Sequence, residues 1–299
     1  MEAIKKTRSL TSKPFNVNLF AGGYSTSESN VDAQHMLSLL ESIHQELGLP
    51  SPTLPPTPKD PFTEQFESVL DSRPPVFSFT FGIPKLDAIQ RLKSRKIVVL
   101  GTATTITEAR ILREAGVDAI VAQGAEAGAH RGTFAGSFEK AMIPTIELVK
   151  GITKVVSLPV IASGGIMDGH DIAKALAAGA SAVQMGTAFL TCPESGAPDA
   201  HKRAILEARN DTIVVTRAFS GRPARGITNA FISKLDGKEN AILPFPLQNA
   251  LTRPMRSAAA KRGDARYLSL WAGKGLTKAR SAPAGELVRV LVKEMEITV

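Results

Sequence analysis

The sequence has few of the features that mark membrane proteins, secreted proteins or metal-binding proteins. Its one cysteine, Cys192, rules out an internal disulfide and any site built on several cysteines. No stretch reaches the ~18 apolar residues that a membrane span requires, and residues 1–10 lack the apolar core of a secretory signal. We therefore expect a cytoplasmic protein with no membrane partner.

Clusters of one charge are also missing. The 36 Lys and Arg residues exceed the 28 Asp and Glu residues and give a net charge of +8, but no run of five or six basic residues suits a phosphate backbone. We expect no nucleic-acid partner. Four histidines show no metal-ligand spacing, so they are interpreted as surface residues and no metal site is predicted: His35, His44, His170 and His201.

The hydrophobic residues indicate an α/β protein. A chain of 299 residues with 43% hydrophobic content can bury a large core. Short β-branched runs alternate with helical patterns, which predicts a parallel sheet, and the runs are apolar on both faces, as in a closed (β/α)8 TIM barrel. Only six such runs are visible, against the eight needed for closure: residues 15–19, 76–80, 97–100, 119–123, 159–162 and 182–185.

The alternation of strands and helices fails past Leu190, which suggests three parts. Residues 1–205 are predicted to form the β/α barrel, residues 206–283 a small helical lid, and residues 284–299 a helix that returns to the barrel. Asp168 is a predicted helix N-cap. The Pro-rich stretch 48–61 cannot be a regular helix or strand and is interpreted as a surface loop rather than a partner-binding segment.

Two glycine-containing loops predict a phosphate site. Gly164 and Gly165 lie between a buried strand and a helix, where backbone N–H groups can approach an anion. One βα unit later, Gly186 again allows close approach and Thr187 offers a hydroxyl donor. Loops after the last two strands of a barrel commonly hold phosphate.

A third loop, residues 122–134, combines small residues with a carboxylate, a histidine and an arginine. His130 is suited to remove a proton from carbon or to bind a substrate anion. Glu126 and Arg131 are expected to orient this loop. Gln123 can bond a cofactor ring edge. Asn18 can either contact a cofactor or form the turn at the end of its strand, and its residue type does not decide between the two. Cys192 is interpreted as a packing residue rather than a nucleophile.

Several of these segments together resemble the class I nitronate monooxygenases, formerly called 2-nitropropane dioxygenases. The likeness runs from about Lys13 to the C-terminus, and it is carried by PFNVNLF, VFSFTFGIP, AQGAEAGAHRGTF, PVIASGGIMDGHDIAKALAAGASAVQMGTAFLTCPESG, SGRPARGITN and LWAGKG. The resemblance implies an FMN cofactor. It assigns the phosphate to Gly164, Gly165, Gly186 and Thr187, the lining to Gln184 and Met185, and flavin contacts to Asn18, Gln123 and Gly128.

The same resemblance makes His130 the catalytic histidine, acting as base toward neutral nitroalkanes. The implied reaction oxidises alkyl nitronates with O2 to a carbonyl compound and nitrite, with the nitronate and O2 as small-molecule partners and self-association left open. A sister function on the same fold is an NAD(P)H-dependent flavin reductase acting on a quinone or an enoyl thioester. A non-catalytic fragment or pseudoenzyme is a further alternative.

Two departures from the family pattern motivate further expectations. Relatives have Gly-Gly-His where this chain has Gly128-Ala129-His130, so Ala129 would be strained if its φ is positive. Relatives also begin with a strand carrying a Pro-Met motif, a helix and a Gly-rich second strand before the segment that matches Lys13. The barrel is therefore expected to be N-terminally truncated by this βαβ segment.

Overall fold

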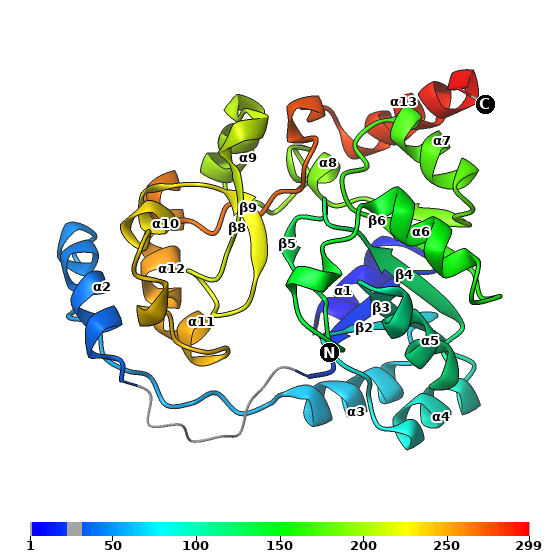
Figure 1. The fold of residues 1–299 in the computed structure, drawn as a ribbon, viewed down its shortest axis with the longest axis horizontal. Helices are drawn as coiled ribbons and strands as arrows, with labels where there is room; N and C mark the ends of the chain where they lie inside the picture. Colours follow the sequence, from blue (N-terminus) through cyan, green and yellow to red (C-terminus); the bar gives the residue numbers. More distant parts are fainter. Residues whose placement is uncertain (1, 23–31, 299) are drawn as a thin grey trace.

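The centre of the protein is a curled sheet of parallel strands (Figure 1). The computed structural model describes residues 2–22 and 32–298. Neighbouring strands pair in the order β1-β2-β3-β4-β6-β7. Their bounds are β1 Asn16–Phe20, β2 Val76–Thr80, β3 Val98–Ala103, β4 Ala119–Gln123, β6 Val160–Ser163 and β7 Ala182–Gln184. These are the six strands predicted from the sequence; within the described residues β1 and β7 form the two edges.

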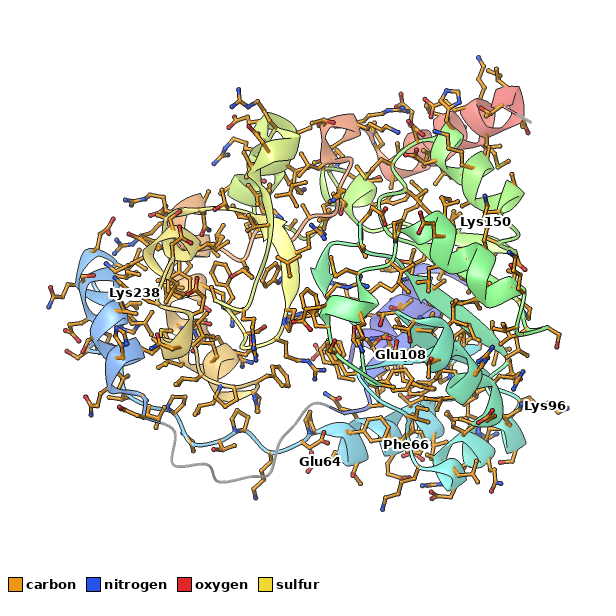
Figure 2. The ribbon with its side chains drawn as sticks, viewed as in Figure 1. Glu64, Phe66, Lys96, Glu108, Lys150 and Lys238 are labelled. Atoms are coloured by element: carbon orange, nitrogen blue, oxygen red, sulfur yellow. The ribbon has the colours of Figure 1, made fainter. Side chains whose placement is uncertain are left out.

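Helices cover the convex face of the sheet, as expected for crossover connections between parallel strands. They are α3 Phe62–Ser72, α4 Leu86–Ser94, α5 Ile106–Glu114, α6 Thr145–Thr153 and α7 Gly169–Ala177, with α1 Glu2–Leu10 preceding β1. A large apolar cluster fills the space between helices and sheet. In Figure 2, Phe66 points into this cluster, while Lys96 and Lys150 point to solvent.

Local sequence explains where these helices begin and end. The Thr105 side chain accepts a hydrogen bond from the Glu108 N–H at the start of α5, and Asp168 does the same for Asp171 at the start of α7, so the predicted N-cap is confirmed. Gly116 and Gly179, just past the two helices, have positive φ values of 86° and 102°. Such stops let each chain segment return directly to the sheet.

The concave face of the sheet is polar, unlike the apolar interior of most β/α barrels. The Ser78 hydroxyl donates to Asn18 Oδ1 at 2.9 Å and accepts from Asn16 Nδ2 at 2.7 Å, which links β1 to β2. Thr80 and Thr102 share a hydrogen bond of 3.2 Å between β2 and β3. These groups line a hollow of about 260 Å³ beneath the strand ends.

The part of the chain predicted to form a lid lies beside the sheet, on the left of Figure 1, and is called the lid below. Its helices are α9 Asp199–Glu207, α10 Ala230–Lys234, α11 Leu247–Leu251 and α12 Arg253–Arg262. The lid also contains strands, which the helical prediction missed: β8 Ile213–Thr216 and β9 Ala224–Ile227 form an antiparallel sheet with β5 Ala129–His130.

The apolar cluster of the lid does not follow the order of the chain. Helix α2, Gln34–Glu46, packs into this cluster through Met36, Leu40 and Ile43, although it precedes most barrel strands. The Pro-rich residues 48–61 have no regular structure, as predicted, and lead from α2 back to α3. The predicted domain boundaries after residues 205 and 283 stay predictions.

The last helix, α13 Ala284–Thr298, returns from the lid to the barrel and packs on α7. Gly169 permits this contact, because a Cβ there would meet the Glu294 side chain and the Met295 backbone. The helix predicted within residues 284–299 is thus present from Ala284 to Thr298. Across residues 2–22 and 32–298, no helix has the length and apolar character to cross a membrane.

Two histidines interpreted as surface residues are buried, and that prediction is wrong for them. His44 is 4% exposed, and its Nδ1 donates to the carbonyl of Pro50 at 2.6 Å, which fastens the Pro-rich loop to α2. His201 is 9% exposed and lies beside the site described below. His35 and His170 are exposed as expected. The sequence spacing did not predict that His44 and His201 are buried, because their burial depends on segments distant in the chain.

Candidate functional site

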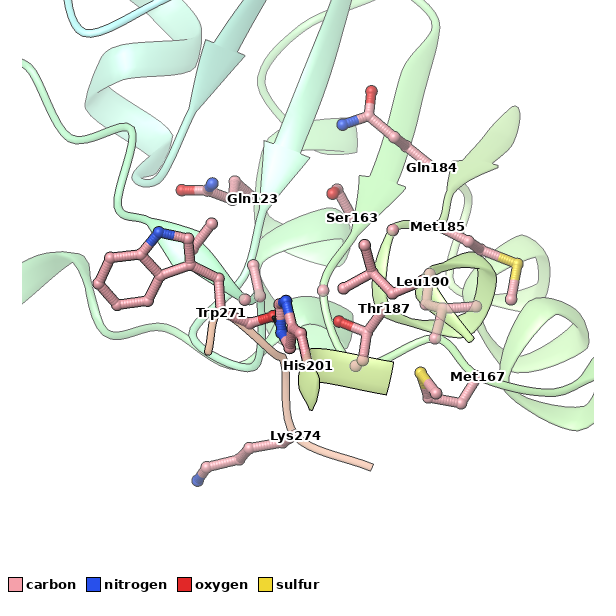
Figure 3. A pocket seen from close by; sticks show the side chains of 17 residues that line it. Gln123, Ser163, Met167, Gln184, Met185, Thr187, Leu190, His201, Trp271 and Lys274 are labelled. Carbon is pink, nitrogen blue, oxygen red and sulfur yellow. Dashed lines mark hydrogen bonds between the residues drawn. The ribbon is translucent and has the colours of Figure 1, made fainter. Parts of the chain in front are cut away.

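A cavity of about 420 Å³ lies at the carboxyl ends of β4, β6 and β7, the edge where parallel α/β sheets bind ligands (Figure 3). Most of its wall comes from loops that follow these strands. The lining residues are Gln123, Ala127, Gly128, Ala129, Ser163, Gly164, Gly165, Ile166, Met167, Gln184, Met185, Gly186, Thr187, Leu190, His201, Trp271 and Lys274.

The loop after β6 makes a tight turn that only glycine accommodates. Gly164 and Gly165 have φ values of 125° and 70°. A Cβ on Gly164 would lie 2.8 Å from the Ala127 nitrogen, and one on Gly165 would lie 2.7 Å from the Glu126 side chain. The turn is therefore pressed against the histidine loop, and its backbone forms the floor of the cavity.

Across the cavity, the loop after β7 presents an open backbone. A Cβ on Gly186 would meet no atom within 4 Å, so this residue borders empty space. The Gly273 N–H donates to Thr187 Oγ1 at 2.9 Å. Because that bond uses only the acceptor side of the hydroxyl, the Thr187 O–H remains available to donate to a ligand.

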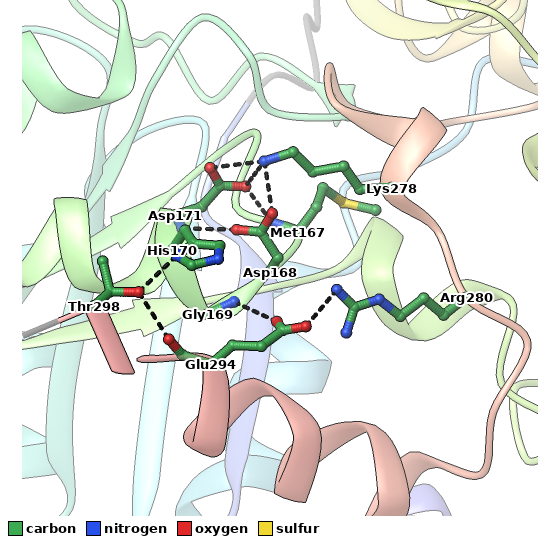
Figure 4. A network of polar contacts seen from close by, with 9 residues as sticks. All are labelled: Met167, Asp168, Gly169, His170, Asp171, Lys278, Arg280, Glu294 and Thr298. Carbon is green, nitrogen blue, oxygen red and sulfur yellow. Dashed lines mark hydrogen bonds and ion pairs between the residues drawn. The ribbon is translucent and has the colours of Figure 1, made fainter. Parts of the chain in front are cut away.

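The start of α7, at first sight an anion site, is already occupied by carboxylates (Figure 4). Asp168 Oδ1 accepts from the Asp171 N–H at 2.8 Å, and Glu294 accepts from the Gly169 N–H at 2.9 Å. Lys278 lies 2.8 Å from both Asp168 and Asp171 and neutralises them in part. An anion in the cavity would therefore meet the glycine turns and not the first turn of this helix.

The residues of the cavity fit the phosphate of a mononucleotide. No hydrogen bond among the described residues uses the backbone N–H of Gly164, Gly165 or Gly186. Unpaired N–H groups at a cavity wall need an acceptor, and three of them with one free hydroxyl form the donor set that a phosphate takes. Lys274, also in the wall, adds a cation.

The histidine loop is held by charged residues, as predicted for Arg131. Arg131 is 2% exposed, and its guanidinium donates to the carbonyls of Gly124, Gln123 and Ala141. The buried Glu108, labelled in Figure 2, accepts from the N–H groups of Phe134 and Ala135 at 2.6 and 2.8 Å. Both ends of the loop are thereby fixed.

His130 lies in an aromatic slot between the barrel and the lid. Its ring centroid is 5.9 Å from that of Phe81 and 5.6 Å from that of Trp271. Its Nε2 lies 2.7 Å from Ser220 Oγ. Burial, together with the charges of Arg222 and Arg256, lowers the pKa of His130 from 6.5 to about 4. The imidazole is therefore neutral near pH 7 and can accept a proton.

Ala129 has the strained backbone that was expected from the glycine found at this position in relatives. Its φ is +60°, in the left-handed region that favours glycine. The residue also pairs with Arg225 in the antiparallel sheet, and the Arg225 guanidinium donates twice to the Ala125 carbonyl. Strain at Ala129 is therefore opposed by contacts with β9, and His130 keeps its place beside Trp271.

A half-buried cation in the lid acts on His130. The Arg222 guanidinium lies 4.0 Å from the centroid of Phe81 and 5.7 Å from that of Phe245. Burial lowers the pKa of Arg222, yet arginine keeps its charge at neutral pH. No carboxylate forms an ion pair with it in the described part of the chain. Such a group attracts an anionic substrate.

The structure brings most of the predicted site residues together. Gln123, Gly128, Gly164, Gly165, Gln184, Met185, Gly186 and Thr187 all line the cavity. Asn18 lines the polar hollow of the sheet, which shares Gln123, Ser163 and Gln184 with the cavity. His130 is not in the cavity wall, but its ring contacts that of Trp271, which is in the wall. Their roles toward a ligand stay predictions.

Several wall residues were missed by sequence reasoning, among them His201, Trp271 and Lys274. In Figure 3, His201 points into the cavity, and its Nε2 donates to the Trp271 carbonyl at 3.1 Å. Trp271 and Lys274 belong to the LWAGKG segment, whose recurrence in the family resemblance was the available signal. Cys192 is 2% exposed within an apolar cluster, which confirms its packing role.

Comparisons with known proteins agree with this geometry. Residues 1–294 match the family model described as nitronate monooxygenase. The chain is 40% identical to a probable nitronate monooxygenase of Staphylococcus haemolyticus, over 99% of this chain and 83% of that protein. It is also 40% identical to a probable nitronate monooxygenase of Staphylococcus aureus strain MSSA476, over 98% of this chain and 83% of that protein.

Among solved structures, the chain is similar to nitroalkane oxidase from Streptomyces ansochromogenes, with a TM-score of 0.90 and 41% identity over 99% of this chain and 84% of that chain. It is also similar to FabK from Thermotoga maritima, with a TM-score of 0.74, 27% identity and coverage of 99% and 80%.

Proposed function

The chain belongs to the nitronate monooxygenase family, and we propose from that premise that it oxidises alkyl nitronates with O2, using FMN, to a carbonyl compound and nitrite. The observation that carries the proposal is the meeting of two loops. The glycine turn at Gly164 and Gly165 packs directly on the loop that ends in His130. A cofactor held by the first loop would therefore border Ala129, the residue next to the proposed base His130.

The phosphate of the cofactor is assigned to the N–H groups of Gly164, Gly165 and Gly186 and to the Thr187 hydroxyl. The single anion site and the cavity of about 420 Å³ suit a mononucleotide better than a dinucleotide. Gln123, Gly128, Gln184 and Met185 would border the remaining part of the flavin. Asn18 would contact it from the sheet hollow. Bound FMN supplies the electron acceptor that takes electrons from the substrate and passes them to O2.

His130 and Arg222 are assigned to the substrate. A neutral nitroalkane must lose a proton from carbon, and the His130 imidazole is available to take it, since a pKa of about 4 leaves the ring unprotonated near pH 7. A nitronate has already lost that proton, so it requires the cation of Arg222 but not the base. Phe81 and Trp271 exclude water from both sides of the imidazole.

The test is a visible absorption spectrum of the purified chain, with the released chromophore identified. Propionate 3-nitronate is then added without oxygen, and the flavin absorbance is followed. Bound FMN that bleaches with the nitronate supports the proposal. Fast bleaching with NADH but not with nitronate would instead assign the flavin reductase activity. A colourless protein that takes up no added FMN would contradict the proposal and favour the alternative of a non-catalytic protein.

A further inference from the structure

The lid supplies one polar contact to the ring of His130. Ser220, 90 residues further along the chain and 1% exposed, lies 2.7 Å from His130 Nε2. Phe81 and Trp271 flank the ring. No hydrogen bond of Nδ1 occurs among the described residues, so the two nitrogens differ: Nε2 is engaged by the lid, and Nδ1 is the nitrogen left for another partner.

The turn that carries Ser220 is also held by groups other than its hydroxyl. Thr252 Oγ1 donates to the Phe219 carbonyl at 2.6 Å, and the Gly221 N–H donates to the Arg217 carbonyl at 2.8 Å. Gly221 has a φ of 82° and packs on the backbone of residues 243–245. Because these contacts hold the turn on both sides of Ser220, we expect loss of the hydroxyl to affect His130 more than the fold of the turn.

The hydrogen bonds around Ser220 favour one position of the His130 proton. The hydroxyl has one proton, and the Arg222 carbonyl, 3.3 Å away, is a partner that can only accept it. In that arrangement Ser220 Oγ accepts from the Arg222 N–H at 3.3 Å and from the ring at 2.7 Å. His130 would then carry its proton on Nε2 and leave the Nδ1 lone pair free.

We propose that Ser220 is the positioning residue for His130, fixing the Nε2–H tautomer and directing Nδ1 to the substrate carbon that loses its proton. The inference rests on the proposed function for its substrate but not for its geometry. The Nε2–H bond to Ser220 survives protonation of Nδ1, because both nitrogens are donors in the imidazolium. The ring therefore need not move when it takes up the proton.

Charges around the ring agree with this arrangement. Arg222 and Arg256 act on His130 from the turn and from α12, and burial acts in the same direction, so the pKa of His130 falls to about 4. No carboxylate contributes to that shift. A neutral Ser220 hydroxyl is thus the group that orients the ring. An ionised partner such as Asp would instead stabilise the imidazolium and raise the pKa.

The kinetic test compares Ser220→Ala and Ser220→Thr in the flavin-loaded enzyme. We expect Ser220→Ala to lower kcat/KM for a neutral nitroalkane by about 10- to 100-fold, the effect of a lost buried hydrogen bond. Turnover of propionate 3-nitronate should change less than about twofold, since it needs no base. Ser220→Thr keeps the hydroxyl and should recover most of the loss. Ser257→Ala, on the exposed face of α12, is the matched control.

The second measurement reads the tautomer directly, by long-range ¹⁵N–¹H NMR of histidine-labelled protein, with the His130 signals assigned by their loss in His130→Gln. The expected result is a protonated Nε2 and an unprotonated Nδ1 at pH 7 in the unmodified protein, and a mixture in Ser220→Ala. A protonated Nδ1 in the unmodified protein would overturn the proposal. So would equal losses for nitroalkane and nitronate in Ser220→Ala.

The two arms separate this inference from the proposed function. If the unmodified protein turns over neither nitroalkane nor nitronate, the proposed function fails, while the NMR arm still reports whether Ser220 fixes the tautomer. If the protein turns over both substrates and the tautomer is wrong, only the role of Ser220 fails.

Discussion

The two walls of the site are built in different ways. The barrel wall consists of short loops, and its main donors are backbone N–H groups at Gly164, Gly165 and Gly186. The lid wall consists of side chains, Ser220 and Trp271 among them, that meet His130 only after distant segments pack together. A site built from backbone N–H groups depends on the conformation of its loops, so its glycines tolerate little change in residue type. A site built from side chains depends on which side chains pack together, so a single substitution can change its chemistry.

The largest effect is expected on the barrel wall, from Gly186→Val. The φ of Gly186 is −116°, and a Cβ there meets no atom, so the fold should be retained. The added side chain would fill the space assigned to phosphate. Losing two charge-assisted hydrogen bonds of ~1.5–3 kcal/mol each predicts about a 10²- to 10⁴-fold weaker affinity for FMN, measured by flavin fluorescence.

Gly196→Val is the matched control for that experiment. Gly196 also borders open space, but it is exposed and lies outside the cavity. Its substitution should leave FMN affinity unchanged. Equal FMN affinity in Gly186→Val and Gly196→Val would remove Gly186 from the phosphate site and would weaken the contrast between the two walls.

On the lid wall, His130→Gln should separate substrate binding from proton removal. Loss of a general base typically lowers the rate by about 10²- to 10⁴-fold. We expect a loss in that range for neutral nitroalkanes, a much smaller loss for nitronates, and unchanged FMN content. Steady-state kinetics with both substrates measures the difference. Equal losses for the two would mean that His130 binds the nitronate and does not act as a base.

Arg222→Gln tests the electrostatic part of the lid wall. Removing this cation should raise the pKa of His130 above about 4, although burial and Arg256 keep it below 6.5. The base form is present above its pKa, so the variant should lose nitroalkane activity at a higher pH than the unmodified enzyme as the pH falls. Activity near pH 8 should change only through substrate affinity.

The pH dependence of kcat/KM between pH 4 and 8 measures this shift. Arg209→Gln is the control, because the Arg209 side chain is 82% exposed and remote from the site. An unchanged acidic limb in Arg222→Gln would show that burial alone sets the pKa of His130.

The difference between the walls also explains what the sequence could and could not predict. Strands such as β2 and β4 were placed correctly because apolar β-branched runs are local signals, and the N-cap at Asp168 is equally local. The antiparallel sheet was missed, because β5 has two residues and pairs with β9 nearly a hundred residues away. Likewise the burial of His201 depends on Trp271, which no local pattern reveals.

The smallest expected effect lies where the two walls join, at Ala129. Its positive φ of 60° costs an L-residue free energy that glycine does not lose, so Ala129→Gly should stabilise the protein by about 0.5–1 kcal/mol. Thermal unfolding of the flavin-loaded protein should then show a rise of about 1–2 °C. Ala258→Gly, inside α12, should act in the opposite direction by about 1 kcal/mol. If Ala129→Gly instead destabilises the protein while nitroalkane turnover falls and nitronate turnover is kept, then the Ala129 methyl group helps hold His130 in its aromatic slot, and the lid wall also depends on backbone strain.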